Sequence, residues 1–174
     1  MNEIRKPTRR RWARWALATL AALGVLALGL TLVSAHLYQG PRTLDAVIAA
    51  MPEAPIFPFS ELTANNRAGQ RAMAIPLWLL RRQGAARAET AFLCVPADPV
   101  FLRAWYTGEL TKADWTLATN GQQRLVFVKN HAAIQVLIGP RRDLLTAYQL
   151  VYLDGLTDRQ VAQLLAPARV DAPR

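Results

Sequence analysis

The feature that most constrains this chain is a run of 21 residues, from Trp15 to Ala35, that contains no charged side chain. A helix rises about 1.5 Å per residue, so a run of this length covers the roughly 30 Å hydrocarbon core of a bilayer. A helix also satisfies its own backbone hydrogen bonds, which a segment surrounded by lipid must do. The run therefore predicts one transmembrane helix over residues 15–37, with the rest of the chain outside the bilayer.

The residues on either side of this run indicate its orientation. The preceding tail, residues 1–14, carries six basic residues and one acidic residue. Because basic residues are enriched on the cytoplasmic side, we expect a single-pass protein of a bacterial inner membrane, with a cytoplasmic N-terminus and a periplasmic C-terminal domain. The expected membrane-anchoring residues are Arg9, Arg10, Arg11, Trp12, Arg14, Trp15 and Tyr38.

A cleaved signal peptide is the alternative interpretation of the same run. The small residues Val33, Ser34 and Ala35 form an acceptable cleavage site, and the flank is basic. The apolar run is longer than the roughly 7 to 15 residues of a signal peptide's apolar region, which favours the anchor. Under both interpretations the residues after the run are exported.

Charge and cysteine content exclude several classes of function. The formal net charge is +9, of which residues 1–14 contribute 6 − 1 = +5. The remaining +4 lacks the clustered basic and aromatic residues that nucleic-acid binding needs, so no nucleic acid is expected as a partner. Cys94 is the one cysteine, which excludes an intrachain disulfide. Its apolar neighbours predict a buried thiol, with an intermolecular link as the alternative.

Residues 38–71 are predicted to be a juxtamembrane helix followed by a proline-rich connector. Thr43 is a candidate N-cap, and apolar residues recur at helical spacing over residues 44–51. Three prolines at a spacing of three residues then end the helix. Phe57 and Phe59, among these prolines, are candidate docking residues for a partner. The alternative is that they cover the domain's own core.

Residues 72–167 are predicted to form an exported domain, followed by a C-terminal tail over residues 168–174. Asp98 and Pro99 predict the start of one helix, and a second should begin near Asp158. The expected fold class is α+β, with the N-terminal transmembrane helix followed by a largely antiparallel sheet and two or three helices packed on one face. Apolar runs between turn residues predict strands at residues 73–80, 89–95, 115–119, 124–129, 133–138 and 147–153.

Residues 88–153 carry a recognisable pattern of a helix, an aromatic-rich turn and following strands. Its parts are Phe101-Leu102-Arg103-Ala104-Trp105-Tyr106, Leu110, Ala113-Asp114-Trp115, Leu125-Val126-Phe127-Val128-Lys129 and Ile134-Gln135-Val136-Leu137-Ile138. The pattern resembles small bacterial membrane-anchored or lipoprotein-type exported domains. Asp114 stands where those domains usually have Gly before the Trp. The resemblance implies the fold and the compartment, and it implies no chemistry.

Motifs for catalysis are missing from the chain. It has no nucleophile elbow, no phosphate-binding loop and no dinucleotide fingerprint, and neither histidine has a further ligand at metal-binding spacing. The acidic residues are scattered singly, which is typical of caps and turns. We therefore predict that the protein is not an enzyme.

His36 is the one candidate cofactor ligand. A neutral imidazole near a membrane interface can bind the metal of a haem or a chlorophyll-type pigment. Light-harvesting polypeptides typically place Ala four residues before the ligand and set both within the span, whereas this chain has Leu32 there and His36 at the edge. A bond from His36 to lipid headgroups or water is the alternative, and the identity of any cofactor stays open.

The small residues of the predicted transmembrane helix lie on one stripe: Ala18, Ala22, Val25 and Gly29. Small residues let helices approach closely, and such packing drives association in lipid; the alternative is that the stripe only reflects an Ala- and Leu-rich composition. The stripe favours a non-catalytic accessory subunit whose partners are larger integral membrane proteins and membrane lipids. A respiratory or photosynthetic assembly is the expected host, because such assemblies recruit single-span accessory subunits. The alternative function is a membrane-tethered binding or sensing domain that acts independently of a complex.

Overall fold

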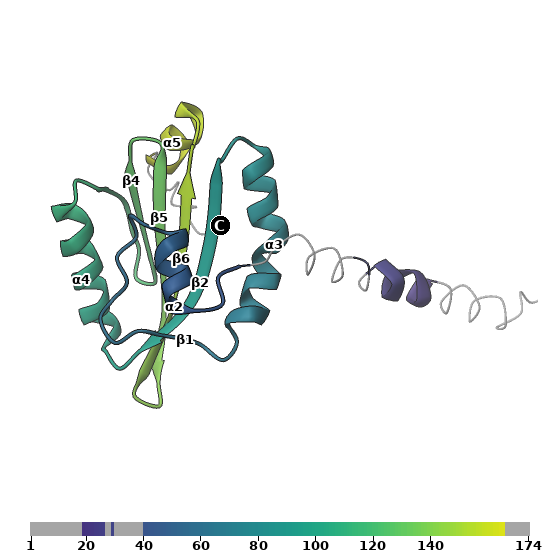
Figure 1. The fold of residues 1–174 in the computed structure, drawn as a ribbon, viewed down its shortest axis with the longest axis horizontal. Helices are drawn as coiled ribbons and strands as arrows, with labels where there is room; N and C mark the ends of the chain where they lie inside the picture. The colour runs from purple at the N-terminus through teal and green to yellow at the C-terminus, as the bar shows by residue number, and fades with distance from the viewer. Residues whose placement is uncertain (1–18, 27–28, 30–39, 166–174) are drawn as a thin grey trace, which may run out of the picture.

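The computed structural model describes residues 19–26, 29 and 40–165, and residues 40–165 form an α+β fold (Figure 1). The six strands form one antiparallel sheet in the order β1-β2-β6-β5-β4-β3. The strands are β1 (Glu61–Leu62), β2 (Arg87–Val95), β3 (Thr116–Asn120), β4 (Arg124–Lys129), β5 (Ala132–Arg142) and β6 (Leu145–Asp154). The helices that follow residue 40 are α2 (Leu44–Ala50), α3 (Asn66–Arg82), α4 (Pro99–Lys112) and α5 (Asp158–Leu165). The predicted α+β class and the antiparallel sheet are confirmed.

The predicted transmembrane helix lies mostly outside the described residues. Residues 19–26 and 29 are helical. Among the helices that the structure describes, none has both the length and the hydropathy needed to cross a bilayer. The span and its orientation therefore stay predictions. The predicted site residues outside the described ranges are Arg9, Arg10, Arg11, Trp12, Arg14, Trp15, Ala18, His36 and Tyr38.

Five of the six predicted strands are present, and the first is wrong. Residues 73–80 lie in α3, which contacts the sheet through Ala74 and Leu77 with Met73 and Leu80 beside them. A continuous apolar run of this length fits a buried strand and a buried helix equally well, so its sequence could not separate the two. The sixth strand is instead β1, which has only two residues.

The predicted helix starts are confirmed by their caps. The Thr43 hydroxyl accepts a hydrogen bond from the Ala46 N–H at 3.2 Å. The Asp98 carboxylate accepts one from the Val100 N–H at 2.8 Å, and Pro99 is the first residue of α4. Each cap satisfies a donor that a helix N-terminus would otherwise leave unpaired.

The hydrogen bonds at the end of α4 show how Asp114 takes the place of the expected Gly. The Trp115 N–H donates to the Leu110 carbonyl at 2.9 Å, and the Asp114 N–H donates to the Thr111 carbonyl at 3.1 Å. These two bonds form a Schellman motif, which places the residue after the cap in the left-handed region. Asp114 has a φ of 63°, so the chain turns into β3 as a Gly would allow.

The two faces of the sheet are covered by different helices (Figure 1). On the first face, α2 and α4 pack over the strands to form the largest core, which includes Leu93, Phe127 and Leu150. On the second face, α3 packs against Val151, and α5 packs near Val128. The strand residues of the two faces alternate along the sequence, as the pleat requires.

The prediction that the helices pack on one face is therefore wrong, and β4 gives the physical reason. Leu125, Val126, Phe127 and Val128 are all buried, although successive residues of a strand point to opposite faces. A strand that is buried on both faces requires a covering layer on both. The four consecutive apolar residues carried that signal in the sequence.

The helix α3 runs beside the open edge of β2 and satisfies part of that strand's backbone. An unpaired strand edge is a template for pairing with other chains, so this contact protects the fold. Three polar side chains of α3 make the bonds: Asn66 Oδ1 accepts from the Phe92 N–H (3.0 Å), Gln70 Nε2 donates to the Thr90 carbonyl (3.3 Å) and Arg81 Nη2 donates to the Ala88 carbonyl (2.9 Å).

The segment before α3 belongs to the same folding unit. Val47 and Met51 are fully buried in the first-face core, and β1 pairs with β2. The boundary predicted between residues 71 and 72 falls inside α3. The predicted connector is thus a structural part of the domain that it was expected to join.

Candidate functional site

The two predicted docking residues, Phe57 and Phe59, have opposite surroundings. Phe57 is 7% exposed and packs edge-on against Trp105, with ring centroids 4.9 Å apart. Phe59 is 87% exposed. Phe57 therefore covers the domain's own core, and its predicted docking role does not hold. Of these two residues, only Phe59 presents its ring to solvent.

Phe59 lies in a turn position that a Phe residue rarely occupies. The Ser60 N–H donates to the Phe57 carbonyl at 3.2 Å, and Phe59 has a φ of 63°. With Pro58 in the second position, this is the pattern of a type II turn, whose third position normally carries Gly. A strained backbone and an exposed aromatic ring both cost stability, and such costs cluster at functional positions.

Two more apolar side chains are exposed close to Phe57. Phe101 is 60% exposed, and its ring packs edge-on against Phe57 with centroids 5.9 Å apart. Val100, its neighbour in the first turn of α4, is 74% exposed. We call Phe59, Val100 and Phe101 the aromatic surface. Phe101 touches Phe57, and Phe59 follows Phe57 by two residues, so these exposed side chains are candidates for a contact with a partner.

Buried hydroxyl groups lie under the turn that carries Phe59. The hydroxyl oxygens of Ser60 and Tyr148 are 2.7 Å apart, and the rings of Tyr148 and Tyr106 pack with centroids 5.8 Å apart. Within residues 40–165, the Tyr106 hydroxyl has no hydrogen-bond partner. Burial, reinforced by Tyr148, holds the pKa of Tyr106 well above its ordinary value, and burial also raises the pKa of Tyr148. Both rings stay neutral at physiological pH.

A second candidate site is a groove on the second face of the sheet, in the part that α3 and α5 leave uncovered. Its volume is about 530 Å³. Phe92 and Leu137 lie on either side of Gln149 in the strand register and form the floor. The loop before α3 and the turn between β3 and β4 form the walls, through Thr63, Asn65 and Gln123.

Two glycines shape this groove. A Cβ at Gly69 would lie 2.6 Å from the Phe92 ring, so only glycine lets α3 pack on that ring in its present position. A Cβ at Gly139 would lie 3.0 Å from the Ala147 carbonyl oxygen, where the pairing of β5 and β6 shifts register. Glycine at these two positions therefore permits the close packing of α3 on Phe92 and of β5 on β6 beside the groove.

The lining of the groove is neutral. Its polar groups are the amides of Asn65, Gln123 and Gln149 and the Thr63 hydroxyl, and no charged side chain contributes. Amides beside apolar groups suit a polypeptide segment or another uncharged ligand better than a phosphate. Cys94 lies in an adjoining hollow and is half-buried, and burial raises the pKa of its thiol.

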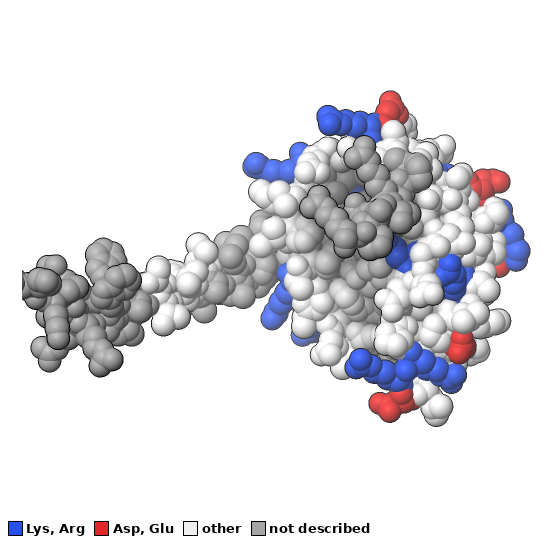
Figure 2. All heavy atoms as spheres, turned by 180° about the vertical axis from the view of Figure 1, so that it is seen from behind, with Lys and Arg blue, Asp and Glu red and all other residues white. Residues whose placement is uncertain are grey.

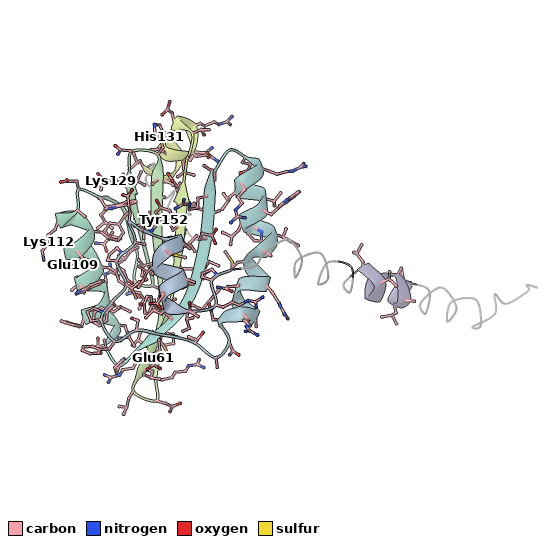
Figure 3. The ribbon with its side chains drawn as sticks, viewed as in Figure 1. Glu61, Glu109, Lys112, Lys129, His131 and Tyr152 are labelled. Atoms are coloured by element: carbon pink, nitrogen blue, oxygen red, sulfur yellow. The ribbon has the colours of Figure 1, made fainter. Side chains whose placement is uncertain are left out.

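The titratable side chains of the domain do not converge. In Figure 3, Glu61 lies at the lower end, Glu109 and Lys112 lie on α4, and His131 lies at the upper end. Lys112 pairs with Glu109 at 2.8 Å, and His131 Nδ1 lies 2.9 Å from the Leu156 carbonyl oxygen. Among the described residues, no group of three or more His, Cys, Asp or Glu side chains is placed to hold a metal ion.

Three of the predicted helix-contact residues fall within the described ranges. Ala22 and Gly29 are exposed, and a Cβ added at Gly29 would have no neighbour within 4 Å. Val25 is 72% exposed. Their side of the helix is thus unoccupied by the described part of this chain, and their role in helix contact stays a prediction.

Sequence analysis missed a joint that fixes the start of the domain. The Pro41 carbonyl accepts hydrogen bonds from Gln70 Nε2 at 3.0 Å and from Asn66 Nδ2 at 3.4 Å. Asn66 and Gln70 are each only 4% exposed, and both also bond to β2. The only sequence signal was a pair of polar residues four positions apart in the predicted connector.

Comparison of the chain with protein-family models, with curated proteins and with solved structures gave no match. The features of the molecule that bear on function are the aromatic surface, the groove and the joint at Pro41.

Proposed function

We propose that this protein is a non-catalytic, single-span accessory subunit of a larger bacterial membrane-protein complex. Its N-terminus would lie in the cytoplasm, and its α+β domain would brace the periplasmic face of the partner. A respiratory or photosynthetic assembly is the proposed host.

The observation that carries this proposal is the joint at Pro41. If the transmembrane helix ends at residue 37, only residues 38–40 separate it from a carbonyl held by two buried amides. Four steps of chain reach at most about 14 Å. A long flexible linker lets a domain move far from its anchor, whereas a short, fixed attachment holds the domain beside the anchor, as a brace requires. The short joint supports the brace.

The aromatic surface supplies a contact for the partner protein. Aromatic side chains dominate the energetics of protein interfaces because they bury a large area with few rotatable bonds. Phe59 is held on a turn whose next residue, Ser60, is tied to Tyr148, so its ring is presented at a fixed place. In the membrane, Ala22 and Gly29 would provide a second contact by allowing close helix packing.

Native mass and composition after gentle solubilisation test the proposal. We expect the tagged full chain to co-purify with larger integral membrane proteins in fixed stoichiometry. Phe59→Ser should reduce this recovery several-fold, because an interface anchor is lost. Leu144→Ser is the matched control: Leu144 is 74% exposed and also has a positive φ, of 69°, but lies in the turn between β5 and β6. Gly29→Leu should weaken recovery without preventing membrane insertion.

A membrane-tethered binding domain is the second candidate, and the groove is the observation that favours it. Its apolar floor and neutral amides have the character of a ligand site. Recovery of the full chain as a free monomer or homodimer, with no change in Phe59→Ser, would replace the accessory-subunit proposal with this one.

A further inference from the structure

We propose that one face of α3 lies on the surface of the membrane and binds anionic lipid headgroups. The inference rests on the proposed membrane anchor and adds an orientation for the domain. The face consists of Arg67, Arg71, Ile75, Trp78, Leu79 and Arg82, and we call it the basic face of α3.

The spacing of these residues places them on one side of the helix, where Ile75 and Trp78 are half-buried and the other four are exposed. Positions 67, 71, 75, 78 and 82 repeat every three or four residues, as one face of a helix does. Four of the residues that precede them by one position, Asn66, Gln70, Ala74 and Leu77, are buried against the domain. The basic face is therefore the side of α3 that the domain itself does not use.

The charge of this face is complementary to anionic headgroups. The sequence of α3 holds four arginines and no acidic residue. Arg81 pairs with Glu89 at 2.6 Å, whereas Arg67, Arg71 and Arg82 form no ion pair with any carboxylate that the structure describes. Seen from behind, the left flank of the domain carries Lys and Arg side chains and no acidic ones (Figure 2).

The apolar members of the face suit the boundary between headgroups and acyl chains. Leu79 is 45% exposed, and the Arg82 guanidinium lies over the Trp78 ring, 4.8 Å from its centroid. Tryptophan and arginine side by side are typical of helices that lie in the membrane interface, with the ring at headgroup depth and the cation at the phosphate.

The joint at Pro41 brings this face within reach of the membrane. The two residues that hold Pro41, Asn66 and Gln70, lie in the first turns of α3. With a span ending at residue 37, Pro41 would lie at most about 14 Å from the end of the span. The first turns of α3 contact Pro41 directly through Asn66 and Gln70. A cationic, partly apolar helix tethered this closely meets the headgroup layer before any soluble partner.

A fluorescent probe on the full chain tests this placement. Leu79→Cys in a Cys94→Ser background is labelled with a nitrobenzoxadiazole and reconstituted in nanodiscs of equal parts phosphatidylglycerol and phosphatidylcholine. Brominated acyl chains should quench its emission by about half, because the probe would sit at the headgroup and acyl boundary. Ala104→Cys, at an exposed position of α4, is the matched control and should not be quenched.

The charge dependence identifies the lipid. Most of the quenching at position 79 should disappear when the nanodisc contains only phosphatidylcholine. It should also disappear in the mixed lipid when the chain carries Arg67→Gln, Arg71→Gln and Arg82→Gln together. Equal quenching in both lipids, or none in either, would overturn the headgroup proposal. A blue-shifted emission without bromine quenching would also overturn it, because the probe would then be covered by protein, in this sample a second copy of the chain. Extraction of cell membranes with alkaline carbonate tests the membrane anchor separately. If the protein resists extraction but its probe is not quenched, only this inference is rejected. If the protein is released from the membrane, the proposed function is rejected as well.

Discussion

The two faces of the sheet differ in how much of their apolar surface the chain itself covers. On the first face, α2 and α4 close over a continuous core in which Leu93, Phe127 and Leu150 have no exposed area. On the second face, α3 and α5 cover the sides and leave the groove around Phe92 and Leu137. The first face therefore carries most of the stability, and the second face has surface left for binding.

The largest expected effect separates the two faces directly. Phe127→Ala should lower the free energy of unfolding by about 3–5 kcal/mol, because a fully buried ring leaves a cavity in a packed core. Phe92→Ala should cost less than half of that, since its ring is half-buried in the groove. Urea unfolding of both variants measures the difference. Equal losses would mean that the second face is packed as tightly as the first.

The next effect concerns the joint between α3, β2 and Pro41. Asn66→Ala should cost about 1–3 kcal/mol, because it leaves the buried Phe92 N–H without its acceptor and weakens the hold on Pro41. Asn65→Ala is the matched control, since the exposed Asn65 makes no capping bond, and it should change stability by less than about 0.5 kcal/mol. A loss no greater than that of the control would remove the support for a fixed joint.

The pH dependence of stability, compared between the wild-type chain and Tyr106→Phe, tests the burial of Tyr106 in the first face. The pKa of Tyr106 is raised by burial, so the unfolded chain, with a pKa of about 10, loses this proton first. Stability should be complete below pH 10 and fall as the pH rises from there towards the folded pKa, by about 1.4 kcal/mol for each unit of difference. Thermal unfolding between pH 8 and pH 11 measures it, and Tyr106→Phe should flatten the decline.

The smallest effect distinguishes the two tyrosine hydroxyls at neutral pH. Tyr148→Phe should cost about 1 kcal/mol, because it breaks the bond with Ser60 under the Phe59 turn. Tyr106→Phe should change stability by close to zero, since its hydroxyl has no partner within the described domain. If Tyr106→Phe were the costlier change, the Tyr106 hydroxyl would have to be hydrogen-bonded in solution, to Tyr148, to the Phe57 backbone or to water.

Local signals in the sequence predicted much of the fold. The caps at Thr43 and Asp98 and the apolar strand runs depend on neighbouring residues, and five strands and three helices followed from them. The errors arose where a pattern was locally ambiguous. The apolar run at residues 73–80 fits either element, and only its contacts with Val151 on the sheet make it helical.

The conformations of two turns also could not be predicted from local sequence. Asp143 and Leu144, between β5 and β6, both have positive φ, at 47° and 69°, without a glycine to announce the turn. Phe59 likewise adopts a conformation that its residue type disfavours. Strand pairing and the bonds around Ser60 impose these conformations, so no local pattern could have predicted them.

For the candidate sites, too, the sequence predicted some features and the tertiary structure decided others. The sequence by itself marked Phe57 and Phe59 as docking candidates, because prolines and aromatic residues alternate there, and it predicted the anchor from a long uncharged run. Only the tertiary structure decided that Phe57 is buried and Phe59 exposed, that Phe92 and Leu137 line one groove, and that Asn66 and Gln70 hold Pro41. Composition and spacing act through adjacent residues and are visible in the chain, whereas a groove or a joint exists only when packing brings distant residues together.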